Sequence, residues 1–147
     1  MFLSKSFGYA LRGVLYVAIK DSEGRKVQLD EIARNIGTPR HFLAKIMKTM
    51  VKEGILSSTK GPYGGFSVND QTLQTKLIQL VKITDGVEQF KTCVLSLRKC
   101  NSNNPCPLHT QMLKLRDDLL AELSQKKISD LLDDKNPDFI KSISIMA

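Results

Sequence analysis

Three cysteines and a histidine lie close together in the second half of the chain, at Cys93, Cys100, Cys106 and His109. Six and then five residues separate the cysteines, and the histidine follows three positions after the last of them. Thiolates are soft ligands that select iron–sulfur clusters, zinc or copper(I). Cysteines with a purely structural role more often lie on apolar helix faces as small hydrophobic residues. The spacing therefore favours a metal or cluster site.

The segment that carries these residues has a composition that suits a ligand loop. Residues 91–109 include three basic and no acidic side chains, and positive charge stabilises thiolates. Asn and Ser are frequent here, and a proline lies on each side of Cys106. We expect residues 91–107 to form a loop that holds a cluster, with zinc as the alternative.

The chain as a whole has an ordinary composition and a basic charge. Its 147 residues carry a formal net charge of +7, and 41% of them are hydrophobic, which suits one soluble domain with an appended arm. The longest apolar run is far shorter than the roughly 18 residues of a membrane span. An odd number of cysteines argues against a secreted disulfide framework. We expect a cytoplasmic protein without a membrane segment.

Three helices are predicted in the first third of the chain. Apolar residues recur three and four positions apart over 6–20 and 29–36, which is the period of an amphipathic helix. Gly37 is expected to end the second helix in the left-handed conformation, and Thr38 is expected to be the N-cap of the third helix, 39–53. The predicted apolar face of that third helix comprises Phe42, Leu43, Ile46, Met47, Met50 and Val51.

A small β-hairpin and two further helices are predicted after it. Residues 55–59 and 66–68 are β-prone, and the Gly-rich connector 60–65 suits a hairpin. Three helices followed by a hairpin are typical of a winged helix-turn-helix. A fourth helix is expected over 72–84, and a long one over about 108–126. The predicted fold is therefore mainly α with a small β-hairpin wing and a long C-terminal dimerisation helix.

These elements divide the chain into three predicted parts. Residues 1–75 would form the winged helix-turn-helix, and residues 76–134 would hold a linker helix, the cysteine loop and the dimerisation helix. Residues 135–147 are a weakly patterned tail, to which we assign no role. The apolar stripe of the long helix favours packing against a second copy of the chain. The alternative is that this helix folds back onto its own domain.

The predicted third helix and wing have the residue types that bind DNA. The second helix of a helix-turn-helix lies in the major groove, where Arg40 could recognise guanine and Lys45 could reach guanine or phosphate. The predicted DNA contacts are Thr38, Arg40, His41, Ala44, Lys45 and Lys48 in the helix and Lys60, Gly61, Tyr63 and Gly64 in the wing. Because the chain has no phosphate-binding loop and no nucleophile motif, we expect no enzymatic activity.

Together these features resemble the Rrf-two family of bacterial transcription regulators, the group that contains IscR, NsrR and CymR. The resemblance covers about residues 2–132. It rests on Tyr9-Ala10-Leu11, Ile32-Ala33, Gly37, Phe42-Leu43, Gly54-Ile55-Leu56-Ser57-Ser58, the wing Lys60-Gly61-Pro62-Tyr63-Gly64-Gly65-Phe66 and the three cysteines.

The resemblance implies a homodimer that binds a near-palindromic DNA operator, with an affinity that responds to an iron–sulfur cluster. The cluster would be [2Fe-2S], or alternatively [4Fe-4S], on the three loop cysteines. His109 matches the fourth ligand of the IscR-like branch, whereas Gly8 replaces the carboxylate that an NsrR-like branch uses. The first cysteine spacing is one residue longer than in IscR. Ala44 replaces a glutamate with which IscR-type regulators choose operators, so their operator preference is not carried over.

Two alternatives remain open from the sequence. One is a winged-helix regulator whose cysteines hold zinc or form a switching disulfide without a cluster. The other is an interaction adaptor that uses the basic helix on a protein or another acidic surface.

Overall fold

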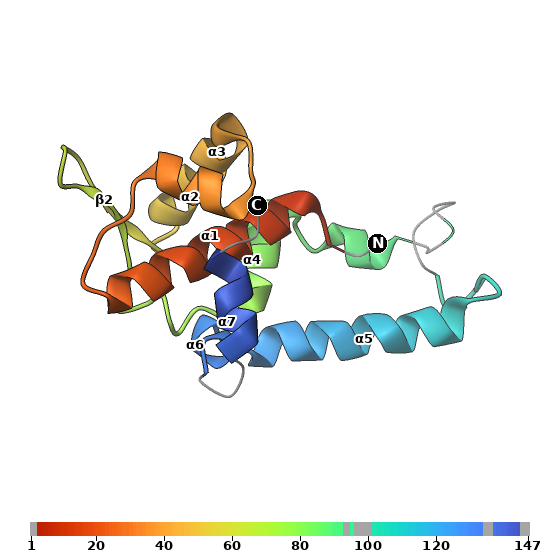
Figure 1. Ribbon diagram of the computed structural model, residues 1–147. Helices are drawn as coiled ribbons and strands as arrows, with labels where there is room; N and C mark the ends of the chain where they lie inside the picture. Colours follow the sequence, from red (N-terminus) through yellow and green to blue (C-terminus); the bar gives the residue numbers. More distant parts are fainter. Residues whose placement is uncertain (1–2, 93–94, 96–100, 134–136, 145–147) are drawn as a thin grey trace.

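The computed structural model describes residues 3–92, 95, 101–133 and 137–144. Its elements in chain order, shown in Figure 1, are α1 (Lys5–Ser22), α2 (Leu29–Ile36), α3 (Arg40–Lys52), β1 (Ser57–Thr59), β2 (Gly65–Ser67), α4 (Leu77–Thr84), the 3-10 helix η1 (Glu88–Lys91), α5 (His109–Gln125), α6 (Ile128–Leu131) and α7 (Pro137–Ser144). The mainly helical fold with a small hairpin is confirmed. No helix among the described residues is long and apolar enough to span a membrane.

The core forms around α1, which packs against α2, α3 and α4. Its inward face is fully buried at Ala10, Val14 and Val17. A Cβ atom added at Gly13 would lie 2.9 Å from the sulfur of Met47 on α3. The missing side chain therefore lets α1 and α3 approach closely, and α3 is fixed in place by its buried stripe.

The wing is a two-stranded antiparallel hairpin in which Ser58 pairs with Phe66. Val27, just before α2, adds a third backbone segment: its N–H donates to the Phe66 carbonyl at 3.0 Å and its carbonyl accepts from the Phe66 N–H at 2.8 Å. The first strand begins two residues later than predicted. Ile55 and Leu56 instead direct their N–H groups to the carbonyl of Met50, at the end of α3.

The fourth helix is also shorter than predicted, because residues 69–75 form a polar turn. The carboxamide oxygen of Asn69 accepts from the N–H groups of Gln71 and Thr72 at 2.8 and 3.2 Å. The Thr72 hydroxyl, fully buried, donates to the Ile55 carbonyl at 2.5 Å. Side-chain bonds of this kind compete with helix formation, so α4 begins only at Leu77.

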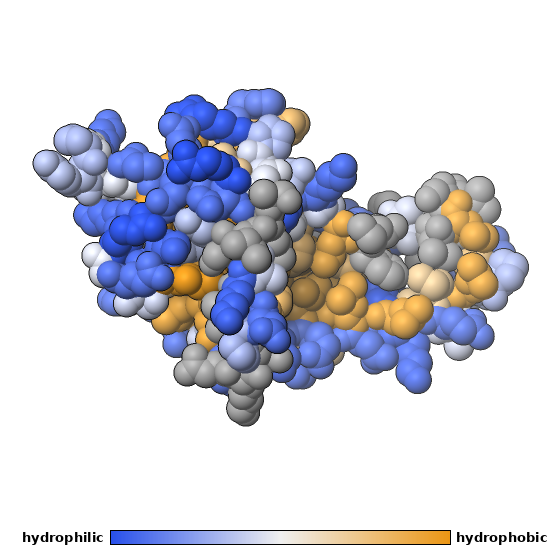
Figure 2. Space-filling view, viewed as in Figure 1, coloured by the Kyte–Doolittle hydropathy of each residue, from blue (hydrophilic) through white to orange (hydrophobic). Residues whose placement is uncertain are grey.

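The long helix α5 projects away from the helical core in Figure 1, close to the predicted range. Leu123, near its C-terminal end, is its single buried residue among those described. Hydrophobic surface continues along the projecting helix in Figure 2, where Leu108 and Leu115 are 44% and 54% exposed. Leu119 and Leu120 are half-buried against the core, so the apolar stripe of this helix is only partly covered within one chain.

The end of the chain is part of the fold, although the sequence pattern there is weak. The helix α7 packs against α1 and α2, and its residue Ile143 is fully buried. The preceding α6 is anchored by Ile128, whose N–H donates to the Thr75 carbonyl at 2.9 Å. Residues 137–144 of the tail, to which no role was assigned from the sequence, therefore contribute to the core.

Candidate nucleic-acid interface and cysteine loop

The helix α3 separates a buried face from a basic one. Leu43, Met47 and Met50 are each 0% exposed, whereas the predicted contacts Arg40, His41, Lys45 and Lys48 are exposed. Ala44, the fifth predicted contact on this helix, is half-buried. The surface over α3 and the wing is mainly hydrophilic in Figure 2. This separation of faces leaves the basic side chains available to a partner.

Arg40 is paired with a neighbouring helix. Its Nε donates to Oδ1 of Asp30, which lies in the first turn of α2. Both side chains are largely exposed, at 65% and 72%. The structure records no hydrogen bond or ion pair of Nη1 or Nη2 with a described residue, so the outer edge of the guanidinium remains available.

Phe42 is not part of the apolar face, contrary to the prediction. It is 53% exposed, and its ring lies 4.7 Å from the ring of His41, measured between centroids. Successive helix residues point about 100° apart. Phe42 therefore lies one step beyond the stripe through Leu43 and Met47 that the core covers, and α3 exposes an aromatic ring beside its basic face.

Thr38 takes a different place from the predicted one. Gly37 ends α2 in the left-handed conformation, as predicted, with φ of 65°. The Thr38 N–H then donates to the Ala33 carbonyl at 3.0 Å, so this residue completes the end of α2. The residue that precedes α3 as its N-cap is Pro39. The Thr38 side chain is 6% exposed, and its hydroxyl has no hydrogen-bond partner among the described residues.

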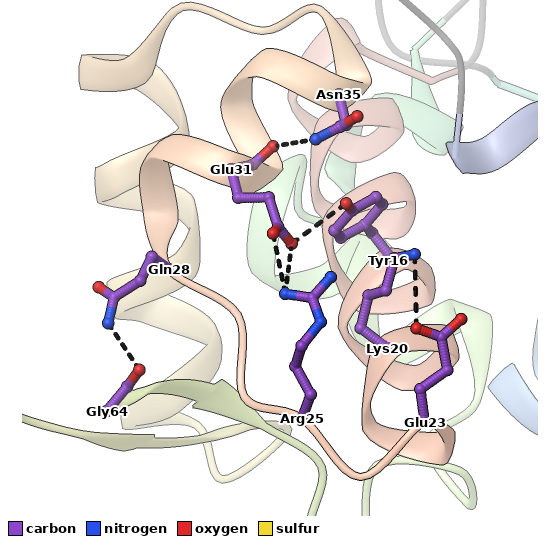
Figure 3. Close-up of polar contacts among 8 residues, drawn as sticks. All are labelled: Tyr16, Lys20, Glu23, Arg25, Gln28, Glu31, Asn35 and Gly64. Carbon is purple, nitrogen blue, oxygen red and sulfur yellow. Dashed lines mark hydrogen bonds and ion pairs between the residues drawn. The ribbon is translucent and has the colours of Figure 1, made fainter. Parts of the chain in front are cut away.

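The wing presents three of its four predicted contacts to solvent. Lys60 and Gly61 are exposed, and Tyr63 is 95% exposed at the tip. Gly64 is buried, and a Cβ there would lie 2.1 Å from the Thr59 carbonyl oxygen. Its own carbonyl accepts from Nε2 of Gln28 at 2.6 Å (Figure 3). Gly64 is therefore required by the packing of the wing.

A polar cluster behind the wing fixes the segment that joins α1 to α2 (Figure 3). Arg25 donates to both carboxylate oxygens of Glu31, at 2.8 and 3.2 Å, and the Tyr16 hydroxyl donates to one of them at 3.2 Å. Burial alone would raise the pKa of Glu31, but the hydrogen bonds and charge of Arg25 outweigh it and lower this pKa. Burial, followed by the charge of Glu31, raises the pKa of Tyr16.

A second polar cluster connects the start of α1 to η1, which precedes the predicted cysteine loop. The Asp85 carboxylate accepts from the backbone N–H of Ser4 at 2.7 Å and from its hydroxyl. Gln89 of η1 donates to the same carboxylate at 3.3 Å. Burial alone would raise the pKa of Asp85, but the hydrogen bonds from Ser4 outweigh it and lower this pKa. Asp85 thereby joins the start of α1, the end of α4 and η1.

The structure places two of the four predicted metal ligands. Cys106 is half-buried and forms no disulfide with a described residue. The backbone N–H of His109 donates to its carbonyl at 3.0 Å, so both residues lie at the start of α5. Cys93 and Cys100 lie outside the described residues. Within the described ranges, no group of three His, Cys, Asp or Glu side chains is placed to hold a metal. A thiol and an imidazole on one turn are donors that suit an iron–sulfur cluster or zinc.

The family model Rrf2, described as an iron-dependent transcriptional regulator, matches residues 3–134. The chain belongs to the Rrf2 family. An HTH-type transcriptional regulator of Aquifex aeolicus (strain VF5) is 31% identical over 134 residues, which span 90% of this chain and 92% of the relative. The protein is thus a DNA-binding transcription regulator with a winged helix-turn-helix, and not an enzyme.

Solved structures share the fold of this Rrf2-family protein. CymR (YrzC), the global cysteine regulator of B. subtilis, matches with a TM-score of 0.70 and 18% identity, over 89% of this chain and 95% of that one. IscR of T. potens matches with a TM-score of 0.67 and 19% identity, over 90% and 86% of the two chains. These likenesses confirm the winged architecture.

Several residues of this Rrf2-family protein that organise the site were not predicted. Gln28 bonds to the wing, Asp30 pairs with Arg40, and Asp85 joins three elements. Acidic residues in the first turn of a helix are common because they complement the helix dipole. The pattern around Asp30 therefore gave no sign of its partner, and no spacing rule connects residues 81 positions apart, such as Ser4 and Asp85.

Proposed function

We propose that this protein is a homodimer that binds a near-palindromic operator and whose DNA affinity is controlled by an iron–sulfur cluster. The observation that carries the DNA-binding mode is the exposed basic face of α3, with the outer edge of Arg40 available beside it. In this arrangement α3 enters the major groove. Arg40 donates to guanine, while His41, Lys45 and Lys48 reach base edges or phosphates.

The wing would contact the sugar-phosphate backbone beside that groove. Lys60 supplies a charge for phosphate, and the exposed tip at Gly61 and Tyr63 approaches the backbone. Val27 and Gln28 tie the wing to the segment that leads into α2. The wing and α3 would therefore bind DNA as one rigid surface.

Dimerisation through α5 is supported by its partly uncovered apolar stripe. Leu108 and Leu115 are exposed, and Met112 and Leu119 are half-buried, along a helix that projects from the core. An exposed apolar face of this kind commonly marks an interface between chains. A dimer would place two α3 helices in successive major grooves, roughly 34 Å apart.

The cluster would be held by Cys93, Cys100, Cys106 and His109. Support comes from the donor set, from the common turn of Cys106 and His109, and from a family model described as iron-dependent. When bound, such a cluster supplies a group that can be oxidised, reduced, nitrosylated or lost. Because the ligand segment lies between η1 and α5, its ordering can change how two winged domains are spaced. Such regulation of DNA affinity requires that the protein make different contacts with and without the cluster.

Anaerobic purification of the full chain tests the cofactor. We expect a brown protein that contains iron and sulfide, and we expect Cys106→Ala to lose the visible absorbance. His109→Ala should alter the absorbance, whereas His41→Ala, a matched change at the other histidine of the chain, should leave it unchanged. Protein that holds zinc and no iron would favour the zinc alternative. Protein without any metal would favour a thiol switch.

Selection of genomic fragments at two salt concentrations tests DNA recognition. We expect enrichment of a near-palindromic sequence. Arg40→Ala should weaken discrimination at one base position by about 1–3 kcal/mol. Lys60→Ala should weaken binding to all sequences alike and reduce the salt dependence. An adaptor for proteins would enrich no sequence at either salt concentration.

A further inference from the structure

We propose that Asp30 is a positioning residue that holds the Arg40 guanidinium in the orientation that reads guanine. This inference rests on the proposed contact of Arg40 with a base. In this proposal the carboxylate of Asp30 on α2 determines how well Arg40 on α3 discriminates guanine from other bases.

The first support is the choice of guanidinium N–H group that bonds to the Asp30 carboxylate. A guanidinium has five N–H donors, one on Nε and four on the two Nη atoms. Asp30 accepts from Nε through Oδ1. Bidentate recognition of the O6 and N7 atoms of guanine uses two parallel N–H donors, and the pair on Nη1 and Nη2 bonds to none of the described residues. The ion pair therefore occupies the inner edge and leaves the outer edge for the base.

The second support is the placement of the two residues. Arg40 is the first residue of α3, and Asp30 lies in the first turn of α2. The helices themselves are fixed by buried side chains such as Ile32 and Leu43, both 0% exposed. The long Arg40 side chain is 65% exposed, and its one hydrogen bond or ion pair to a described residue is the bond to Asp30. The direction of its fork therefore depends on Asp30.

The third support is energetic. An arginine side chain has a large rotamer entropy, and less of it is lost on binding when the guanidinium is already oriented. An exposed ion pair contributes little to folding stability, so Asp30 is better explained by orientation than by stability. Its negative charge faces the surface that DNA would cover, and it opposes binding to every phosphate backbone. Asp30 should therefore lower the affinity for all DNA while it raises the discrimination between bases.

The opposing account gives a different signature. If the ion pair opens on DNA, Asp30 only complements the dipole of α2 and repels phosphate. Removing it would then tighten binding to every sequence by the same factor. The ratio of affinities for two sequences separates the two accounts, because a uniform charge effect cancels from that ratio.

The test uses the full chain and the operator obtained by selection. The dissociation constant is measured for this operator and for a copy in which the guanine read by Arg40 is replaced by adenine. The discrimination ratio is the dissociation constant for the substituted copy divided by that for the operator. Arg40→Ala should reduce this ratio by roughly 5- to 150-fold, the equivalent of one bidentate contact. Asp30→Ala should reduce the same ratio by about threefold or more, a part of that contact, and should tighten binding to the substituted copy. In the Arg40→Ala background, Asp30→Ala should have no further effect on the ratio.

Asp70→Ala is the matched control. Asp70 is an exposed aspartate of the same domain that forms no ion pair with a described residue, so its loss changes the net charge equally and should leave the ratio unchanged. Asp30→Ser repeats the test if alanine disturbs the first turn of α2, because its short side chain removes the carboxylate while its hydroxyl suits the start of a helix. A wild-type ratio in both Asp30 variants, with the ratio lost in Arg40→Ala, would overturn the role of Asp30. A wild-type ratio in Arg40→Ala would instead overturn the proposed base contact itself.

Discussion

The Nε2 atom of Gln28 donates a hydrogen bond of 2.6 Å to the carbonyl oxygen of Gly64, so the residue that precedes α2 holds the base of the wing tip. Lys26 adds a second side-chain link, from its Nζ to the Thr59 hydroxyl at 3.0 Å. With the two backbone bonds between Val27 and Phe66, three successive residues connect the wing to the helix-turn-helix. The orientation of the wing on DNA therefore depends on this short segment.

We expect Gln28→Ala to weaken binding to every DNA sequence by roughly two- to tenfold, the equivalent of one hydrogen bond. The base preference should not change, because the wing reads the backbone. Anisotropy titrations with the operator and with a random duplex measure both effects. Gln71→Ala, at an exposed glutamine whose side chain bonds to no described residue, is the control. Wild-type affinity in Gln28→Ala would show that the wing does not need this bond.

Two glycines of α1 should respond in opposite ways to the same substitution. A Cβ at Gly8 meets nothing within 4 Å, whereas at Gly13 it would lie 2.9 Å from the sulfur of Met47. Gly8→Ala should stabilise the protein by about 0.5–1 kcal/mol through its helix propensity. Gly13→Ala should be destabilising by up to about 2 kcal/mol, because overpacking costs about 1–3 kcal/mol and the gain in helix propensity offsets only part of it. Urea unfolding measures both. Equal stabilities would contradict the close approach of α1 and α3.

Thr38 and Thr72 form a second matched pair. Both are buried, but the Thr38 hydroxyl has no partner among the described residues, whereas the Thr72 hydroxyl donates to the Ile55 carbonyl. Thr38→Val should be neutral or stabilising by about 1 kcal/mol, and Thr72→Val should cost about 1–3 kcal/mol. Urea unfolding measures the change in the free energy of unfolding for both variants. A loss of stability in Thr38→Val would mean that its hydroxyl is hydrogen-bonded.

The lowered pKa of Asp85 makes stability depend on pH in the acid range. Its folded pKa lies below the ordinary value near 3.9, so its contribution is fully present above that value and disappears as the pH falls through the folded pKa. Asp85→Asn should lower the unfolding free energy at pH 7 and flatten its decline in acid. The control is Asp70→Asn, in an exposed turn. An unchanged acid decline in Asp85→Asn would contradict the role of Ser4 as its partner.

The elements that were predicted well are those with a repeating apolar pattern. The helices α1, α2, α3 and α5 follow from the spacing of side chains that reach a core, and the left-handed Gly37 follows from glycine chemistry. The first strand and α4 were predicted too long, and the second strand lies one residue earlier than predicted. Their ends depend on side-chain and backbone bonds from Asn69, Thr72 and Met50, which compete with regular structure and leave no periodic signal.

The details of the site depend on tertiary contacts that one sequence does not display. Phe42 and Leu43 are both apolar neighbours in α3, and the position of α1 decides that Leu43 is buried and Phe42 is not. Burial of Ile143 in α7 could not be predicted, because its contacts come from α1 and α2 at the other end of the chain. The partner of Arg40 on α2 was missed for the same reason.

The most direct test of the proposed regulation is the affinity of anaerobically purified, full-length protein for its selected operator, measured before and after removal of the cluster. Coupling between two sites commonly amounts to about 1–3 kcal/mol, or 5- to 150-fold in affinity. We expect a difference of at least about fivefold that disappears in Cys106→Ala. Iron-containing protein that binds the operator with the same affinity in both states would contradict control of this DNA-binding protein by a cluster.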